Sequence, residues 1–200
     1  MRSAVLTLGG YQGRHAPTSH DDFLAFAKTV CPPHVFAAFR DADWLGDARQ
    51  HRYPAARRRY YERLTRFPSG FLVTGDGICS FNPLFGQGMT VAAMQAIALR
   101  EALTGGRDDL ASRFFTAAAL PVGQAWQMAV SSDRVTLGLP RSALERMTGT
   151  YLNRLHVAAE RDPVLVRRFF DVTGLVEAPS SLFTPGVLLR VLTGNLRRRL

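Results

Sequence analysis

Apolar and polar residues follow the period of an α-helix over most of the second half of the chain. Between Met89 and Leu103, apolar side chains recur every three or four residues, which predicts one closely packed helix. The same spacing predicts helices over 20–30, 33–42, 110–130, 142–160, 163–172 and 184–200. The region from residue 107 onward is therefore expected to be mainly helical.

Two short apolar runs have the length of strands. One is Ala4–Leu8, and the other is Phe71–Val73, which lies between Gly70 and Gly75. The second run suits a strand that is buried on both faces, and such strands belong to parallel sheets. The sequence contains too few strands to build that sheet by itself, so the edges of the strand would stay unpaired. The expected fold class is an α/β (α+β) remnant, with one strand–helix unit before a mainly helical C-terminal region.

A polar, glycine-rich segment joins the expected strand to the helix behind it. Asp76 follows the strand, at the end where open α/β sheets bind ligands. Gly86 and Gly88 allow the backbone to approach a ligand closely, and the start of the helix carries partial positive charge. The segment thus offers a carboxylate for a hydroxyl-rich ligand and a helix end for an anionic or polarised group. Its candidate cofactor-binding residues are Gly75, Asp76, Pro83, Gly86, Gln87, Gly88 and Met89.

The order and spacing of these residues resemble the second flavin-binding motif of the FAD-dependent aromatic hydroxylase and squalene-epoxidase-like oxidoreductases. By this resemblance, Asp76 would bind the ribityl chain of FAD. The backbone of 86–90 would face the pyrimidine end of the isoalloxazine, and Pro83 would line the ring. The chain departs from the motif at Gly77, where the family often has Ala, and at Thr90, where it often has Asn.

The resemblance also implies an activity. In that family, NAD(P)H reduces FAD, and the reduced flavin activates oxygen for the hydroxylation or epoxidation of an apolar small molecule. No side chain of this sequence is expected to act as a catalytic nucleophile, and its Ser, His and Cys residues form no recognisable triad. A flavin-dependent reductase of isoprenoid double bonds shares the Gly-Asp motif and is the second enzyme hypothesis.

The resemblance predicts how the chain is divided. Residues 1–68 would form the end of a substrate domain with connecting helices, 69–106 the C-terminal part of a Rossmann-like FAD-binding domain, and 107–200 a helical C-terminal region. The family binds the FAD diphosphate with a G-x-G-x-x-G segment and also carries a middle Asp-Gly motif, and the sequence contains neither. The chain is therefore expected to be the C-terminal half of a flavoprotein, from a truncated or split gene.

Composition changes this interpretation little. The chain has 25 Lys+Arg against 16 Asp+Glu, a formal net charge of +9, and Lys28 is its sole lysine. Richness in arginine and alanine can reflect nucleotide bias of the gene, so no nucleic-acid partner is inferred. Cys31 and Cys79 provide neither a disulfide framework nor the spacing of a metal site. Neither a signal pattern nor a transmembrane run is found in the sequence, and a cytoplasmic location is expected.

Two arginine-rich segments each allow two interpretations. Arg57-Arg58-Arg59-Tyr60 is either a solvated segment or a source of one or two contacts to substrate or cofactor. Residues 184–200 combine an apolar helical stripe with Arg190 and Arg197–Arg199. They would either pack on the domain or lie on an anionic membrane surface or a partner protein. A non-catalytic fragment that docks through this basic helix is the hypothesis outside the enzyme class.

Overall fold

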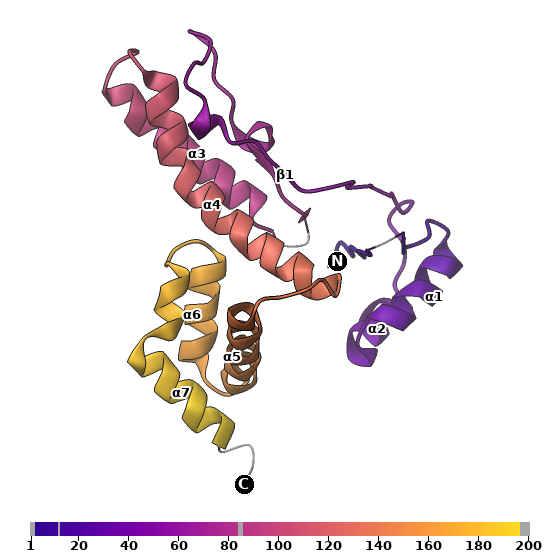
Figure 1. The fold of residues 1–200 in the computed structure, drawn as a ribbon. Helices are drawn as coiled ribbons and strands as arrows, with labels where there is room; N and C mark the ends of the chain where they lie inside the picture. The colour runs from indigo at the N-terminus through magenta and orange to yellow at the C-terminus, as the bar shows by residue number, and fades with distance from the viewer. Residues whose placement is uncertain (1–2, 12, 84–85, 197–200) are drawn as a thin grey trace. The chain divides into compact units, whose positions relative to one another are not determined.

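Seven α-helices dominate the computed structural model, which describes residues 3–11, 13–83 and 86–196 (Figure 1). Besides the helices, the described residues contain two strands of two residues each, which pair as one antiparallel sheet. The expectation that the region from residue 107 onward is mainly helical is thus confirmed for its described part. The chain divides into two compact units, Met1–Pro54 and Ala55–Leu200.

The first unit contains α1 (His20–Val30) and α2 (Pro33–Phe39), as the apolar spacing predicts. Trp44 packs against α1, with its ring 5.3 Å from that of Phe23 in an edge-on arrangement. The expected strand Ala4–Leu8 is wrong, because these residues adopt no regular structure. Among the described residues, no strand lies beside this run to satisfy its backbone, and Val5 is exposed.

In the second unit, one strand precedes the glycine-rich segment in sequence and the other lies within it. β1 (Arg57–Arg58) pairs antiparallel with β2 (Cys79–Ser80), so that Arg57 faces Ser80 and Arg58 faces Cys79. Two 3₁₀ turns accompany them, η1 (Tyr61–Arg63) and η2 (Gly75–Gly77).

The expected buried strand Phe71–Val73 is also wrong. Residues 71–74 are not part of a strand, and Phe71 is 58% exposed. The Phe71 ring stacks on the ring of Phe67, with centroids 6.0 Å apart. No neighbouring strand is present among the described residues to accept the backbone hydrogen bonds that a central strand must make.

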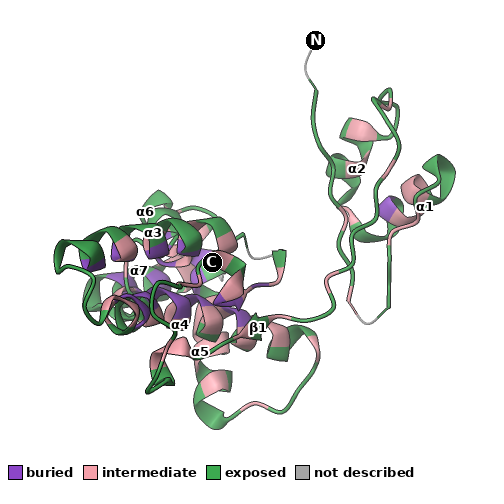
Figure 2. Cartoon of the chain, turned by 90° about the horizontal axis from the view of Figure 1, so that it is seen from above, coloured by how far each residue is buried: buried purple, intermediate pink, exposed green. Residues whose placement is uncertain are grey.

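Two long helices form the centre of the second unit. α3 (Gly88–Thr104) packs along α4 (Leu110–Thr136), and Gly105-Gly106 begins the turn between them (Figure 1). Their shared core contains Val91, Phe114 and Val122, and it also includes Ile78 and Cys79 from the segment before α3. The buried residues therefore lie on the inward faces of the helices, as Figure 2 shows.

The remaining helices build a second core. They are α5 (Ala143–Ala159), α6 (Pro163–Thr173) and α7 (Pro185–Leu196), with the 3₁₀ turn η4 (Pro179–Phe183) before α7. Leu155, Leu165 and Val191 are among the residues buried between them. Met128 of α4 packs against both cores and so connects them.

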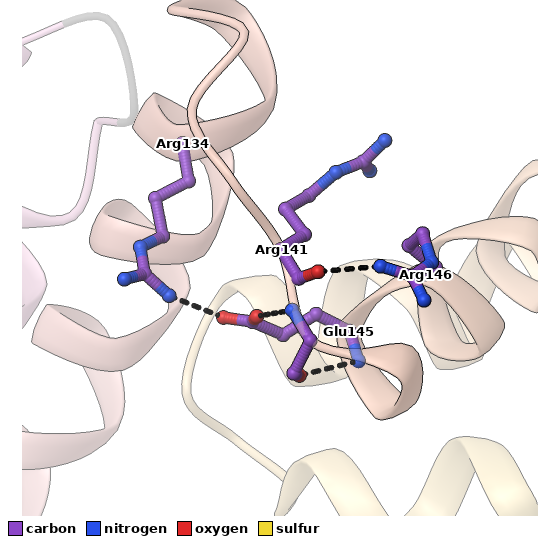
Figure 3. A network of polar contacts seen from close by, with 5 residues as sticks. Arg134, Arg141, Glu145 and Arg146 are labelled. Carbon is purple, nitrogen blue, oxygen red and sulfur yellow. Dashed lines mark hydrogen bonds and ion pairs between the residues drawn. The ribbon is translucent and has the colours of Figure 1, made fainter.

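Local sequence explains where these helices begin. Ser142 and Glu145 form a capping box at the start of α5: Glu145 N donates to Ser142 Oγ at 3.2 Å, and Ser142 N donates to Glu145 Oε2 at 2.6 Å. The guanidinium of Arg134 donates to the same carboxylate at 2.8 Å, which ties the cap to α4 (Figure 3). Asp162 caps α6 by accepting from Val164 N at 2.9 Å.

Candidate functional site

The Gly75–Gly77 turn has a glycine with a positive φ at one end and a glycine close to a valine side chain at the other. Gly75 has a φ of +59°, in the left-handed region. A Cβ at Gly77 would lie 2.5 Å from Val73 Cγ1, so a side chain there would displace Val73. The turn closes through Ile78 N, which donates to Gly75 O at 3.0 Å. The contact with Val73 therefore explains why Gly77 stands where the resembled motif often has alanine.

A hydrogen bond fastens this turn to the middle of α3. Gly75 N donates to Gln95 Oε1 at 2.7 Å, and Gln95 is only 1% exposed. The sequence places Gln95 on the packing face of the helix without giving it a role. A single glutamine on an otherwise apolar face was the signal that could have identified this contact, since a buried amide needs a polar partner.

Asp76 is the exposed residue of the turn. Its carboxylate oxygens accept hydrogen bonds, and the exposure of the residue leaves them within reach of a ligand. On the inner side of the segment lies the Cys79 thiol, whose pKa burial raises to about 12, with a smaller contribution from Asp76 and an opposing one from Arg58. Cys79 is therefore a protonated core residue at neutral pH and not a nucleophile.

Arg59 holds the same turn from the side of the strands. Its backbone N–H donates to Ile78 O at 2.8 Å, which extends the β1–β2 ladder by one bond. Its guanidinium donates to Gly77 O at 3.1 Å. The turn that carries Asp76 is thus fixed by Arg59 on one side and by Gln95 on the other.

Arg58 has a different, structural environment. Its guanidinium pairs with Glu62 at 2.9 Å, with the two side chains 10% and 19% exposed. The same group lies 4.5 Å from the centroid of the Tyr60 ring, and a Cβ added at Gly123 on α4 would meet its Nη1 at 3.5 Å. Arg57, by contrast, is exposed. Of the three arginines that the sequence left open, Arg58 supports the fold and Arg59 supports the candidate site.

The second part of the candidate site is the start of α3. Gly86 has a φ of +66° and donates its N–H to Pro83 O at 3.2 Å, two residues before the helix begins. No side chain caps α3, and a Cβ at Gly88 would meet open space. As in any α-helix, the first N–H groups have no intrahelical acceptors, and Gly88 is partly exposed. Met89, in the first turn, is almost fully exposed.

The side chain of Gln87 points into the protein rather than toward this surface. Gln87 is 7% exposed, and its Nε2 donates to Thr173 O at 3.2 Å. The side chain of this predicted site residue therefore does not reach a ligand beside Gly88.

The two parts of the candidate site lie along one helix. Gln87 and Gln95 are eight residues apart on α3, which corresponds to about 12 Å along its axis. A small anion could not contact both the Asp76 turn and the helix start, whereas an elongated ligand could. Among the described residues, no cluster of three or more His, Cys, Asp or Glu side chains is arranged to hold a metal.

The fold and this segment define a mainly helical protein with a glycine-rich, aspartate-bearing turn fastened to a central helix. No protein-family model matches the chain. The chain is similar to Protein Rv3254 of Mycobacterium tuberculosis (strain ATCC 25618 / H37Rv), with 33% identity over an alignment of 200 residues. The alignment covers 96% of this chain. The chain spans 42% of the length of that relative. In the part of the chain that the structure describes, each helix is too short or too polar to cross a membrane.

Proposed function

We propose that this chain supplies the C-terminal flavin-contacting segment of an FAD-dependent oxidoreductase, a monooxygenase that acts on an apolar small molecule with NAD(P)H as electron donor. One observation carries the proposal. The exposed Asp76 carboxylate and the uncapped start of α3 are attached to the same helix, in the order of the motif that the sequence resembles.

The residues present fit the part of FAD that the motif would contact. Asp76 has open acceptor sites for the ribityl hydroxyls, and Gly88 leaves room for a ring to approach the backbone. The N–H groups at the start of α3 would donate to the pyrimidine carbonyls, and the helix dipole would favour negative charge there. Pro83 would lie against the ring. When bound, FAD supplies hydride acceptance and oxygen activation, while the chain binds and orients it.

The proposal limits what this segment does. The diphosphate-binding motif of the resembled family is absent from the 200 residues, so these residues would contact the ribityl chain and the ring. No described side chain is assigned to proton transfer or to covalent catalysis. The work of this segment would be to position the cofactor and to stabilise charge on its pyrimidine end.

Titration of the purified chain with FAD, followed by flavin fluorescence and by the visible absorption spectrum, tests this proposal. We expect saturable binding that Asp76→Asn weakens by about tenfold or more, since one charge-assisted contact contributes about 1.5–3 kcal/mol. Asp21→Asn is the matched control, because Asp21 is an exposed carboxylate of the other unit. If Asp76→Asn binds as tightly as the wild type, Asp76 is not a flavin ligand.

A second candidate function is peripheral attachment to an anionic membrane through α7. Val187 and Val191 bury one side of this helix, while Leu189, Leu192 and Leu196 are exposed on another. An apolar face on a helix favours the membrane interface, and Arg190 of the same helix pairs with Asp162 at 2.8 Å. Arg197–Arg199, which the sequence adds to the basic part of this segment, lie outside the described residues.

Sedimentation with vesicles tests this second candidate. The chain would co-sediment with phosphatidylglycerol vesicles and not with phosphatidylcholine vesicles, and the double substitution Leu189→Ser/Leu192→Ser would abolish the binding. Leu103→Ser, at an exposed leucine of α3, is the control and should bind like the wild type. Binding that survives the double substitution would exclude α7 as the attachment site.

A further inference from the structure

Gln87 lies where α3, α4 and α6 meet. Its Nε2 donates to Thr173 O at 3.2 Å and lies 3.8 Å from Met128 Sδ. Thr173 is the last residue of α6, so its carbonyl has no donor within its own helix. The Gln87 amide supplies that donor and joins the start of α3 to the end of α6.

The chain beyond Thr173 strengthens this junction. Leu175 adopts a φ of +62°, which is unfavourable for a residue with a Cβ, yet it is buried in the core of α3 and α4. Leu175 N donates to Val172 O at 3.1 Å, which closes the end of α6 beside Gln87. Because a strained leucine is inserted into the core here, the end of α6 is fixed against α3 rather than loosely packed.

Gln87 also begins α3. Its carbonyl accepts from Val91 N at 3.0 Å, and no side chain caps the helix. Gln87 is thus a buried residue between Gly86 and Met89, which are both exposed. Movement of the side chain would move the first turn of the helix.

We infer that Gln87 is a positioning residue, through which α4 and α6 hold the first turn of α3 in place for a ligand. The inference rests on the proposed function in so far as that turn faces the flavin. It gives the C-terminal helices a role at the candidate site, although no residue of those helices belongs to the motif. Gln87 Oε1 is buried without a recorded partner, so the donor atom Nε2 alone carries the interaction.

Amide hydrogen exchange of Gln87→Met tests the inference without any flavin. Methionine keeps the volume and removes the donor, so the amides of Val91 and Leu175 should exchange about tenfold faster, the change expected on losing one hydrogen bond. Amides in the middle of α4 should not change. Gln127→Met, an exposed neighbour of Met128, is the control. Unchanged exchange at Val91, or an equal increase throughout α3 and α4, would overturn a positioning role.

A second variant, Gln87→Glu, adds a reversible readout. Its ionised carboxylate can only accept, so at pH 8 the protection of Val91 should fall as in Gln87→Met. Burial raises the pKa of a carboxyl group, so at pH 5 the protonated form can donate to Thr173 O again. At pH 5, the exchange protection of the Val91 amide should therefore return to the value that the wild type shows at the same pH. No recovery at pH 5 in a folded variant would overturn the inference.

Flavin titration separates this inference from the proposed function. We expect Gln87→Met to weaken FAD binding about tenfold. If the wild-type chain takes up no FAD, the proposed function fails while the exchange data still decide the role of Gln87. If the wild type binds FAD and Gln87→Met binds equally well, the positioning role is overturned and the proposed function stands.

Discussion

The backbone N–H of Gly75 donates to Oε1 of Gln95 at 2.7 Å, and this bond fastens the turn that carries Asp76 to the central helix α3. Because the helix itself is anchored in the core by Val91 and Ala98, the bond transmits the rigidity of the core to an exposed carboxylate. A ligand that needs Asp76 in a fixed position depends on this contact as much as on Asp76.

Gln95→Met should free the turn while leaving the protein folded. The variant removes the acceptor for Gly75 N, so the Gly75 amide should exchange about tenfold faster. Gln95 Nε2 is buried without a recorded partner, and its removal offsets part of the loss. The free energy of unfolding in urea should therefore change by less than about 1.5 kcal/mol. An unaltered Gly75 exchange rate would show that Gln95 does not hold the turn.

Arg58 and Arg57 should differ sharply in their effect on stability. Arg58→Met leaves the partly buried Glu62 without its partner and should lower the free energy of unfolding by about 1.5–3 kcal/mol. Arg57→Met, at the exposed neighbouring position, should stay within about 0.5 kcal/mol of the wild type. Urea unfolding followed by circular dichroism measures both. Equal effects of the two substitutions would contradict the structural role given to Arg58.

Gly194 and Gly186 of α7 provide a pair in which the same substitution has opposite effects. A Cβ at Gly194 would lie 2.8 Å from Ala158 Cβ, so Gly194→Ala should push α7 away from α5 and destabilise the chain by about 1–3 kcal/mol. A Cβ at Gly186 would meet nothing within 4 Å, so Gly186→Ala should stabilise the helix by about 0.5–1 kcal/mol. Thermal unfolding of both variants checks the signs. Stabilisation by Gly194→Ala would rule out the close packing of α5 and α7.

The capping box at α5 should make stability depend on pH. The backbone N–H and the hydroxyl of Ser142, together with Arg134, hold the pKa of Glu145 below its ordinary value of 4.5. A lowered folded-state pKa gives stability that is fully present above the unfolded pKa and is lost as the pH falls through the folded one. The wild type should thus exceed Glu145→Gln in stability at pH 7, and the difference should shrink below about pH 4.

Urea unfolding of the two proteins between pH 7 and pH 3 measures that difference. Glu101→Gln, at an exposed carboxylate of α3, is the control and should show a much smaller dependence. A difference between the wild type and Glu145→Gln that stays constant down to pH 3 would mean that the charge on Glu145 does not contribute.

Helices could be predicted from the sequence because their signals are local. Ser142 with Glu145, Asp162-Pro163 and Pro185 mark helix starts through capping and through the fixed φ of proline, and the structure begins α5, α6 and α7 at these points. The predicted C-terminus of α2, Ala42, lies beyond the observed one, Phe39, because helix ends carry weaker sequence signals.

The expected strands failed because a strand depends on partners that the local sequence does not specify. Phe71–Val73 has the composition of a buried strand, but no strand lies beside it among the described residues, and Phe71 stacks on Phe67 instead. The roles of Gln95 and Arg59 were missed for a related reason. Their partners, Gly75 and Gly77, lie 20 and 18 residues away in sequence, and only the folded chain brings them together.

The most direct test of the central claim is a hydrogen-exchange footprint of FAD on the purified chain. The proposed site predicts that saturating FAD slows exchange at Gly75–Gly77 and at Gly86–Val91, and that Asp76→Asn removes the first footprint at the same FAD concentration. Residues 143–159 of α5 should be unaffected. A folded chain whose exchange FAD leaves unchanged, or protects only outside these two segments, would contradict the assignment of a flavin site.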